Sequence, residues 1–135
     1  MLSTLPLVLV FYYAKITNGD YTPSLIRDYA VVESLVAGVD PQVITKVIDS
    51  ESGFVADKVH YNDGKKGCNS VGLVQIRDCD HPTISKAQAE DPIFAVNFLI
   101  QNIDKCHSWW QNTCKGLNVQ SASISSLTGV NQSSP

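Results

Sequence analysis

The chain has 135 residues, of which 44% are hydrophobic and 17% are charged. This length suits one domain, and the apolar content is sufficient for a packed core, which argues against a mainly disordered chain. The net charge of −3 argues against a nucleic-acid binder that relies on phosphate contacts. No apolar run reaches the roughly 18 residues that a membrane-spanning helix requires.

Residues 1–19 are typical of an export signal. The stretch Leu5–Ala14 is uncharged and apolar, with a length within the roughly 7–15 residues of a secretory hydrophobic segment. Thr17 and Gly19 place small residues before a possible cleavage site. Because no Lys or Arg precedes the apolar stretch, a buried N-terminal helix or the remnant of a truncated membrane anchor stays open as an alternative. We expect an extracytoplasmic protein that is secreted, periplasmic or associated with the cell envelope.

An even number of cysteines in a small chain favours a disulfide framework in an oxidising compartment. The four are Cys68, Cys79, Cys106 and Cys114. Three pairings are possible, and we favour Cys68–Cys79 with Cys106–Cys114 because each closes a short loop. A zinc site that uses His81 or His107 is the alternative, but the chain contains no Cys-x-x-Cys pair. We therefore expect no metal.

Helix-start signals recur along the chain. A capping side chain followed by proline predicts helices over residues 23–37 and 41–52, which Gly38 and Gly53 should end. The segment from His81 to Thr83 predicts the start of another short helix, and Asp91-Pro92 predicts a longer helix that extends to about Lys105.

The remaining segments carry weaker patterns. The polar, glycine-containing residues 57–70 indicate a loop, and the short apolar run 71–76 is compatible with a strand or a helix. Residues 116–135 are serine-rich and uncharged, which predicts a flexible tail after a domain over residues 20–115. No alternating pattern is long enough for a sizeable sheet, so we expect a mainly α fold with little or no sheet.

Glu51 is the strongest candidate for a catalytic residue. It lies four residues after Val47 and three after Ile48, so it continues the apolar stripe of its predicted helix. Burial and the negative end of the helix dipole both disfavour an ionised carboxylate there and should raise its pKa. Such a group can act as a general acid near neutral pH. The alternative is a helix-end glutamate that points to solvent.

Two motifs resemble those of the soluble lytic transglycosylase family. The first is Glu51-Ser52-Gly53-Phe54, and the second is Ser70-Val71-Gly72-Leu73-Val74-Gln75, with valine where the family has methionine. The helix that starts at Asp91-Pro92 matches the family's next element, and the resemblance covers roughly residues 25–105. It implies a compact lysozyme-like helical domain that acts on peptidoglycan glycan strands, as a monomer without a cofactor.

The resemblance implies that Glu51 cleaves the β-1,4 bond between N-acetylmuramic acid and N-acetylglucosamine and leaves a 1,6-anhydromuramic end. A muramidase that hydrolyses the same bond, or a catalytically weak wall-binding or assembly module, is the alternative. A hydrolase usually needs a second carboxylate. The candidates for it are Asp57, Asp63, Asp78 and Asp80.

We also assign substrate-binding roles to several polar and aromatic residues. Ser52, Ser70 and Gln75 come from the family motifs. Asn97 interrupts an apolar helix, and Trp110, with Trp109, offers a flat apolar surface for sugar rings. The family's Ala-Tyr-Asn segment is missing after residue 105. In the family, the tyrosine of this segment lines the active site. Either the tryptophan pair takes its place here, or the cleft is shorter, or the activity is weak.

Overall fold

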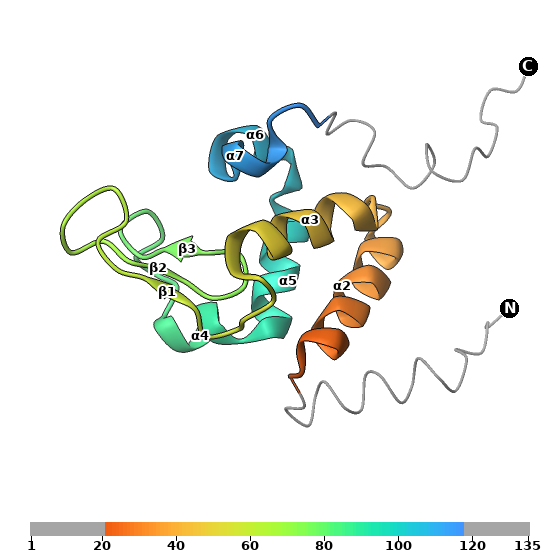
Figure 1. Ribbon diagram of the computed structural model, residues 1–135, viewed down its shortest axis with the longest axis horizontal. Coiled ribbons are helices and arrows are strands. Elements are labelled where there is room, and N and C mark those ends of the chain that lie inside the picture. The colour runs from red at the N-terminus through yellow and green to blue at the C-terminus, as the bar shows by residue number, and fades with distance from the viewer. Residues whose placement is uncertain (1–20, 118–135) are drawn as a thin grey trace, which may run out of the picture.

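The computed structural model describes residues 21–117. The elements occur in an order in which helices precede and follow a small sheet (Figure 1). The helices are α2 (Pro23–Ala37), α3 (Pro41–Ser52), α4 (Lys86–Glu90), α5 (Pro92–Gln101), α6 (Cys106–Trp109) and α7 (Gln111–Cys114), with a 3-10 turn η1 (Ile103–Lys105). The strands are β1 (Val59–His60), β2 (Ser70–Val71) and β3 (Ile76–Arg77). The mainly α prediction is therefore confirmed.

Each of the longer helices starts at a capping residue followed by proline. The Thr22 hydroxyl accepts a hydrogen bond from the Leu25 amide at the start of α2. Asp40 caps α3 in the same way, and Asp91 caps α5. These caps satisfy backbone donors that the first turn of a helix leaves free, while proline supplies a pre-set φ angle. The three predicted starts are confirmed.

Glycine ends α2 and α3 as the sequence predicts. Gly38 has φ 74° and Gly53 has φ 61°, both in the left-handed region that favours glycine. The Gly53 amide donates to the Asp49 carbonyl at 2.9 Å and so closes the last turn of α3. This closure fixes the end of the helix immediately after Glu51.

Two helix boundaries differ from the sequence-based expectations. No helix starts at His81–Thr83, because residues 81–84 form a turn and α4 begins only at Lys86. Its start is set by a capping box between Ser85 and Gln88. Helix α5 ends at Gln101, not near residue 105, because the Asn102 side chain donates to the Phe98 carbonyl at 2.8 Å and a 3-10 turn follows.

A three-stranded antiparallel sheet lies within residues 57–77, where the sequence predicts a loop and an apolar run of ambiguous type. The strand order is β1-β2-β3, with Val59 opposite Val71 and Val71 opposite Ile76. Each strand has only two residues, too few to leave an alternating pattern in the sequence. Figure 1 shows this sheet at one side of the helices, with α6 and α7 at the top.

The core is one continuous apolar cluster that joins helices and sheet. The predicted stripe of α3 is buried, with Ile44, Val47 and Ile48 fully enclosed. The cluster also contains residues of α2, α5, the sheet with its β2–β3 turn, and the segment of α6 and α7. Full burial of a large apolar side chain contributes about 1.5–3 kcal/mol. This packing holds α3 rigidly, so the residues of its last turn have a defined position.

The two terminal predictions fall mostly outside the described part of the chain. The signal expected over residues 1–19 lies outside it, as do residues 118–135 of the expected tail. Gly116 and Leu117, which we assigned to that tail, are described, and Leu117 packs against the core. The packed unit therefore extends beyond residue 115. Within residues 21–117, no helix is long and apolar enough to cross a membrane.

Candidate active site

A cavity of about 640 Å³ opens beside the end of α3. One side is formed by the sheet and the loop between β1 and β2, and the other by α5, α6 and the residue that follows α6. Small-molecule sites in proteins commonly have volumes of about 300–1,000 Å³. The lining includes the charged residues Glu51, Lys58, His60, Asp63, Arg77, Asp80 and His81, the polar Ser70, Gln75 and Ser108, and the aromatic Phe98, Trp109 and Trp110.

Glu51 lies in the last turn of α3 and lines this cavity half-buried. Burial raises the pKa of its carboxyl group above the ordinary value, which is the largest effect. The Lys58 ammonium lowers this pKa, and the Asp63 carboxylate raises it again, so the net direction is upward. A carboxyl group with this bias can hold a proton and deliver it to an atom inside the cavity.

Lys58 joins the end of α3 to the sheet. Its ammonium Nζ donates to the Glu51 carbonyl oxygen at 2.9 Å. Its own carbonyl oxygen accepts hydrogen bonds from the Gly72 amide at 2.8 Å and from Gln75 Nε2 at 3.2 Å. Lys58 was not predicted as a site residue, because a lysine in a polar loop has no distinguishing signal before the loop is folded back on the helix.

Gln75 lines the cavity, as its assignment to substrate binding requires. Its Nε2 donates to the carbonyl oxygens of Lys58 and Gly72, at 3.2 and 3.0 Å. A side-chain amide has two N–H donors, so both are used within the protein, and the acceptor Oε1 is the atom available to a ligand. Gln75 has φ 54°, an uncommon conformation for a residue with a Cβ atom, and such strain concentrates at functional sites.

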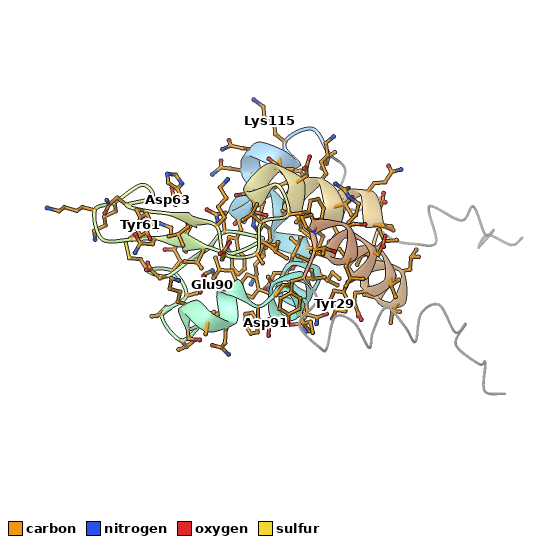
Figure 2. The ribbon with its side chains drawn as sticks, turned by 60° about the horizontal axis from the view of Figure 1, so that its bottom comes forward. Tyr29, Tyr61, Asp63, Glu90, Asp91 and Lys115 are labelled. Atoms are coloured by element: carbon orange, nitrogen blue, oxygen red, sulfur yellow. A yellow bond between two sulfur atoms is a disulfide. The ribbon has the colours of Figure 1, made fainter. Side chains whose placement is uncertain are left out.

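Ser70 and Asp63 meet on the sheet side of the cavity. Ser70 is buried in β2, and its hydroxyl donates to Asp63 Oδ2 at 2.6 Å. Figure 2 shows Asp63 on the loop side of the molecule, far from Tyr29 and Asp91 on the helical side. The ring of His60 lies 3.7 Å from Asp63 Oδ1. Ser70 thus holds the Asp63 carboxylate in place, and the charge of this carboxylate raises the pKa of Glu51.

The structure narrows the four candidates for a second carboxylate. Asp63 and Asp80 line the cavity, whereas Asp57 and Asp78 do not. Both carboxylate oxygens of Asp80 accept hydrogen bonds from Arg77 at 3.0 Å. Asp63 is therefore the acid that combines a place in the cavity with an electrostatic effect on Glu51.

Both tryptophans line the cavity but differ in exposure. Trp110 is buried, and its Nε1 donates to the Val74 carbonyl at 2.8 Å. Trp109 is 39% exposed and stacks on Phe98, with centroids 5.9 Å apart. Lys105 Nζ lies 4.6 Å from the centroid of the Trp109 ring. Trp110 thus forms part of the wall, and Trp109 offers the more accessible aromatic surface.

Two residues assigned to substrate binding do not line the cavity. Ser52 is buried, and its hydroxyl donates to the Ile48 carbonyl within α3. Asn97 contacts α2 instead, where its Nδ2 donates to the Tyr29 hydroxyl at 3.3 Å. The Asn97 bond depends on which face of α5 packs against α2, which the sequence does not specify. The Ser52 bond is local to α3, where a serine hydroxyl donates to the carbonyl four residues earlier.

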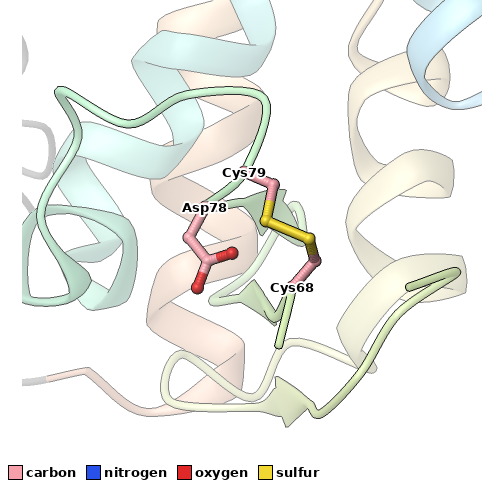
Figure 3. Close-up of side chains that lie close together, drawn as sticks. All are labelled: Cys68, Asp78 and Cys79. Atoms are coloured by element: carbon pink, nitrogen blue, oxygen red, sulfur yellow. A yellow bond between two sulfur atoms is a disulfide. The ribbon is translucent and has the colours of Figure 1, made fainter. Parts of the chain in front are cut away.

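Both favoured disulfides are present. Cys68–Cys79 connects the loop that precedes β2 to the segment that follows β3, and Cys106–Cys114 closes the segment that carries the tryptophans. Figure 3 shows Asp78 beside the first disulfide, a cluster with the residue types of a metal site. The sulfur atoms are bonded to each other, so no thiolate is available as a ligand there.

Comparison with known proteins does not assign the chain to a family. No protein-family model, curated protein or solved structure matches the chain. The residues that line the cavity are therefore the basis for a functional proposal.

Proposed function

We propose that this chain is a peptidoglycan lytic transglycosylase that acts outside the cytoplasm. The observation that carries the proposal is the half-buried carboxyl group of Glu51, whose raised pKa and place in a cavity of about 640 Å³ suit a general acid. The resemblance of the Glu51–Phe54 and Ser70–Gln75 segments to the family motifs supports the same activity. Two disulfides are compatible with an oxidising compartment.

The proposed reaction uses one carboxyl group twice. Protonated Glu51 donates its proton to the glycosidic oxygen as the bond to the anomeric carbon of N-acetylmuramic acid breaks. The resulting carboxylate then accepts the proton of the 6-hydroxyl group of that sugar while O6 attacks the anomeric carbon. Glu51 ends protonated, one glycosidic bond has been replaced by the anhydro bond, and no water is consumed. The sugar supplies the nucleophile, so a second carboxylate is not required.

Hydrolysis by the same cavity is a second candidate, favoured by Asp63. This carboxylate lines the cavity, is anchored by Ser70 and acts electrostatically on Glu51. In a muramidase it would serve as the base for a water molecule or as the group that stabilises the positive charge on the sugar. The two reactions differ in product, since hydrolysis leaves a reducing end that is heavier by one water.

Digestion of purified sacculi by the full chain tests the proposal. Mass spectrometry should find fragments that end in 1,6-anhydromuramic acid. Glu51→Gln should lower their release by at least about 100-fold, because general acid catalysis is lost. Asp49→Asn likewise replaces a carboxyl group by an amide, at an exposed position of the same helix, and should leave release unchanged.

Other products would contradict the proposal. Reducing ends alone, together with loss of release in Asp63→Asn, would identify a hydrolase. Glycan binding without release at any pH between about 4.5 and 8 would identify a binding or assembly module.

A further inference from the structure

The charged residues of the cavity are unequally paired. Arg77 donates to both oxygens of Asp80 and, through Nε, to the Asp63 carbonyl. His60 lies beside Asp63. Lys58 differs, because within residues 21–117 its ammonium has no carboxylate within 4.0 Å and donates one hydrogen bond, to a neutral carbonyl. An ammonium has three N–H donors, so two are available to a ligand.

Hydrogen bonds hold Lys58 both at its backbone and at the end of its side chain. The Lys58 carbonyl is held by Gly72 and Gln75, and its Nζ is held by the last turn of α3. A group that is already oriented loses less conformational freedom on binding. Because Nζ bonds to the backbone of Glu51, the unpaired charge lies directly beside the proposed catalytic residue.

We propose that Lys58 is a specificity-determining residue that binds a carboxylate of the substrate next to the bond to be cleaved. This inference rests on the proposed function. N-acetylmuramic acid differs from N-acetylglucosamine by a lactyl group that ends in a carboxylate or in a peptide with carboxylates of its own. Binding of this group selects acidic glycan over neutral glycan and orients the muramic sugar toward Glu51.

The test measures binding in a Glu51→Gln background, where cleavage and the titration of Glu51 no longer contribute. Three probes are titrated by calorimetry: a neutral N-acetylglucosamine oligomer, peptidoglycan strands stripped of peptides, and strands with peptides. Adding Lys58→Met should weaken binding of an acidic probe about tenfold and leave the neutral probe unchanged, because a charge-assisted hydrogen bond is lost. Lys58→Arg should retain the preference.

The pattern among the probes identifies the carboxylate. If Lys58→Met weakens the binding of stripped strands, Lys58 binds the carboxylate of the lactyl group. If it weakens only the binding of strands with peptides, Lys58 binds a carboxylate of the peptide. Lys46→Met removes a lysine from an exposed position of α3 outside the cavity. It should leave the binding of both kinds of strand unchanged. The preference for acidic strands should also decrease as the salt concentration rises from about 0.02 to 0.3 M, because salt screens the interaction.

Two failures are distinguishable. If Lys58→Met weakens all three probes equally, or none, while the wild-type chain cleaves sacculi, Lys58 does not select the substrate and only this inference is overturned. If no probe binds and sacculi stay intact, the proposed function fails and this inference fails with it.

Discussion

At the scale of single residues, opposing charges act on Glu51. Burial and Asp63 raise the pKa of its carboxyl group, whereas Lys58 lowers it. Of the three, only the direction of the burial effect follows from the position of Glu51 on an apolar helix stripe. Lys58 and Asp63 belong to a loop seven to twelve residues downstream, and their effect required that loop to fold back on α3.

A side chain at position 72 would collide with the backbone of α4. Gly72 has φ 86°, and a Cβ atom placed on it would lie 1.9 Å from the carbonyl oxygen of Ala89. Gly72→Ala should therefore cost at least about 3 kcal/mol of unfolding free energy, since α4 must move. Urea denaturation followed by circular dichroism measures this loss.

Gly67→Ala is the matched control for Gly72→Ala. Gly67 has nearly the same φ, 87°, but apart from its chain neighbours no atom of residues 21–117 lies within 4 Å of a Cβ atom there. Gly67→Ala should lower the free energy of unfolding by about 1–2 kcal/mol, which is the cost of placing alanine in a left-handed backbone conformation. Equal losses in the two variants would show that α4 does not restrict Gly72.

At the scale of elements, short helices complete the cavity. Helices α6 and α7 have four residues each, below the length at which a helix is stable by itself. They are held by the Cys106–Cys114 disulfide, by the bond from Trp110 to Val74, and by the bond from Thr113 to Ser50 in α3. The stability of this cavity wall therefore depends on one disulfide and on tertiary hydrogen bonds rather than on helix propensity.

Removal of the disulfide by Cys106→Ala with Cys114→Ala should destabilise the protein by about 2–3 kcal/mol. Both tryptophans of the chain lie between these cysteines. Their fluorescence should therefore shift to longer wavelength as the wall loosens and water reaches the rings. Unfolding in urea and the emission spectrum of the folded state give the two measurements.

The control removes the other disulfide, by Cys68→Ala with Cys79→Ala. This bridge closes a loop of similar size, with a sequence separation of 11 against 8. It should give a similar loss of stability and little change in tryptophan emission. The same spectral shift in both variants would mean that the wall is not held locally.

At the scale of the whole molecule, the raised pKa of Glu51 couples stability to pH. The folded state binds this proton more tightly than the unfolded state, so its contribution is fully present below the ordinary pKa of 4.5. It is lost as the pH rises through the higher pKa of the folded state. The free energy of unfolding should therefore decrease over that interval through this group.

Glu51→Gln should remove this dependence on pH. The variant should gain stability relative to the wild type between about pH 4 and pH 8, as measured by urea unfolding at each pH. Asp49→Asn controls for loss of one acidic group from α3. A difference between Glu51→Gln and wild type that stays constant with pH would contradict the raised pKa.

Elements whose formation depends on neighbours along the chain could be predicted before the fold was known. Caps and glycine ends are local, so the bounds of α2 and α3 could be predicted closely. The short loops favoured the observed disulfide pairing, although the sequence allowed three pairings. The apolar stripe of α3 favoured the inner face for Glu51 over the solvent side, because helix periodicity is also a local property.

The side chains that surround Glu51 could not be predicted in the same way, because they come together only in the folded chain. Two-residue strands carry no periodic signal, so the sheet that brings Asp63, Ser70 and Lys58 to the cavity was not predicted. Asn97 donates to Tyr29 of α2 because the packing of helices, and not the sequence pattern, sets which neighbour its side chain contacts. The composition of the cavity depends on contacts between distant segments, and these form only when the chain is folded.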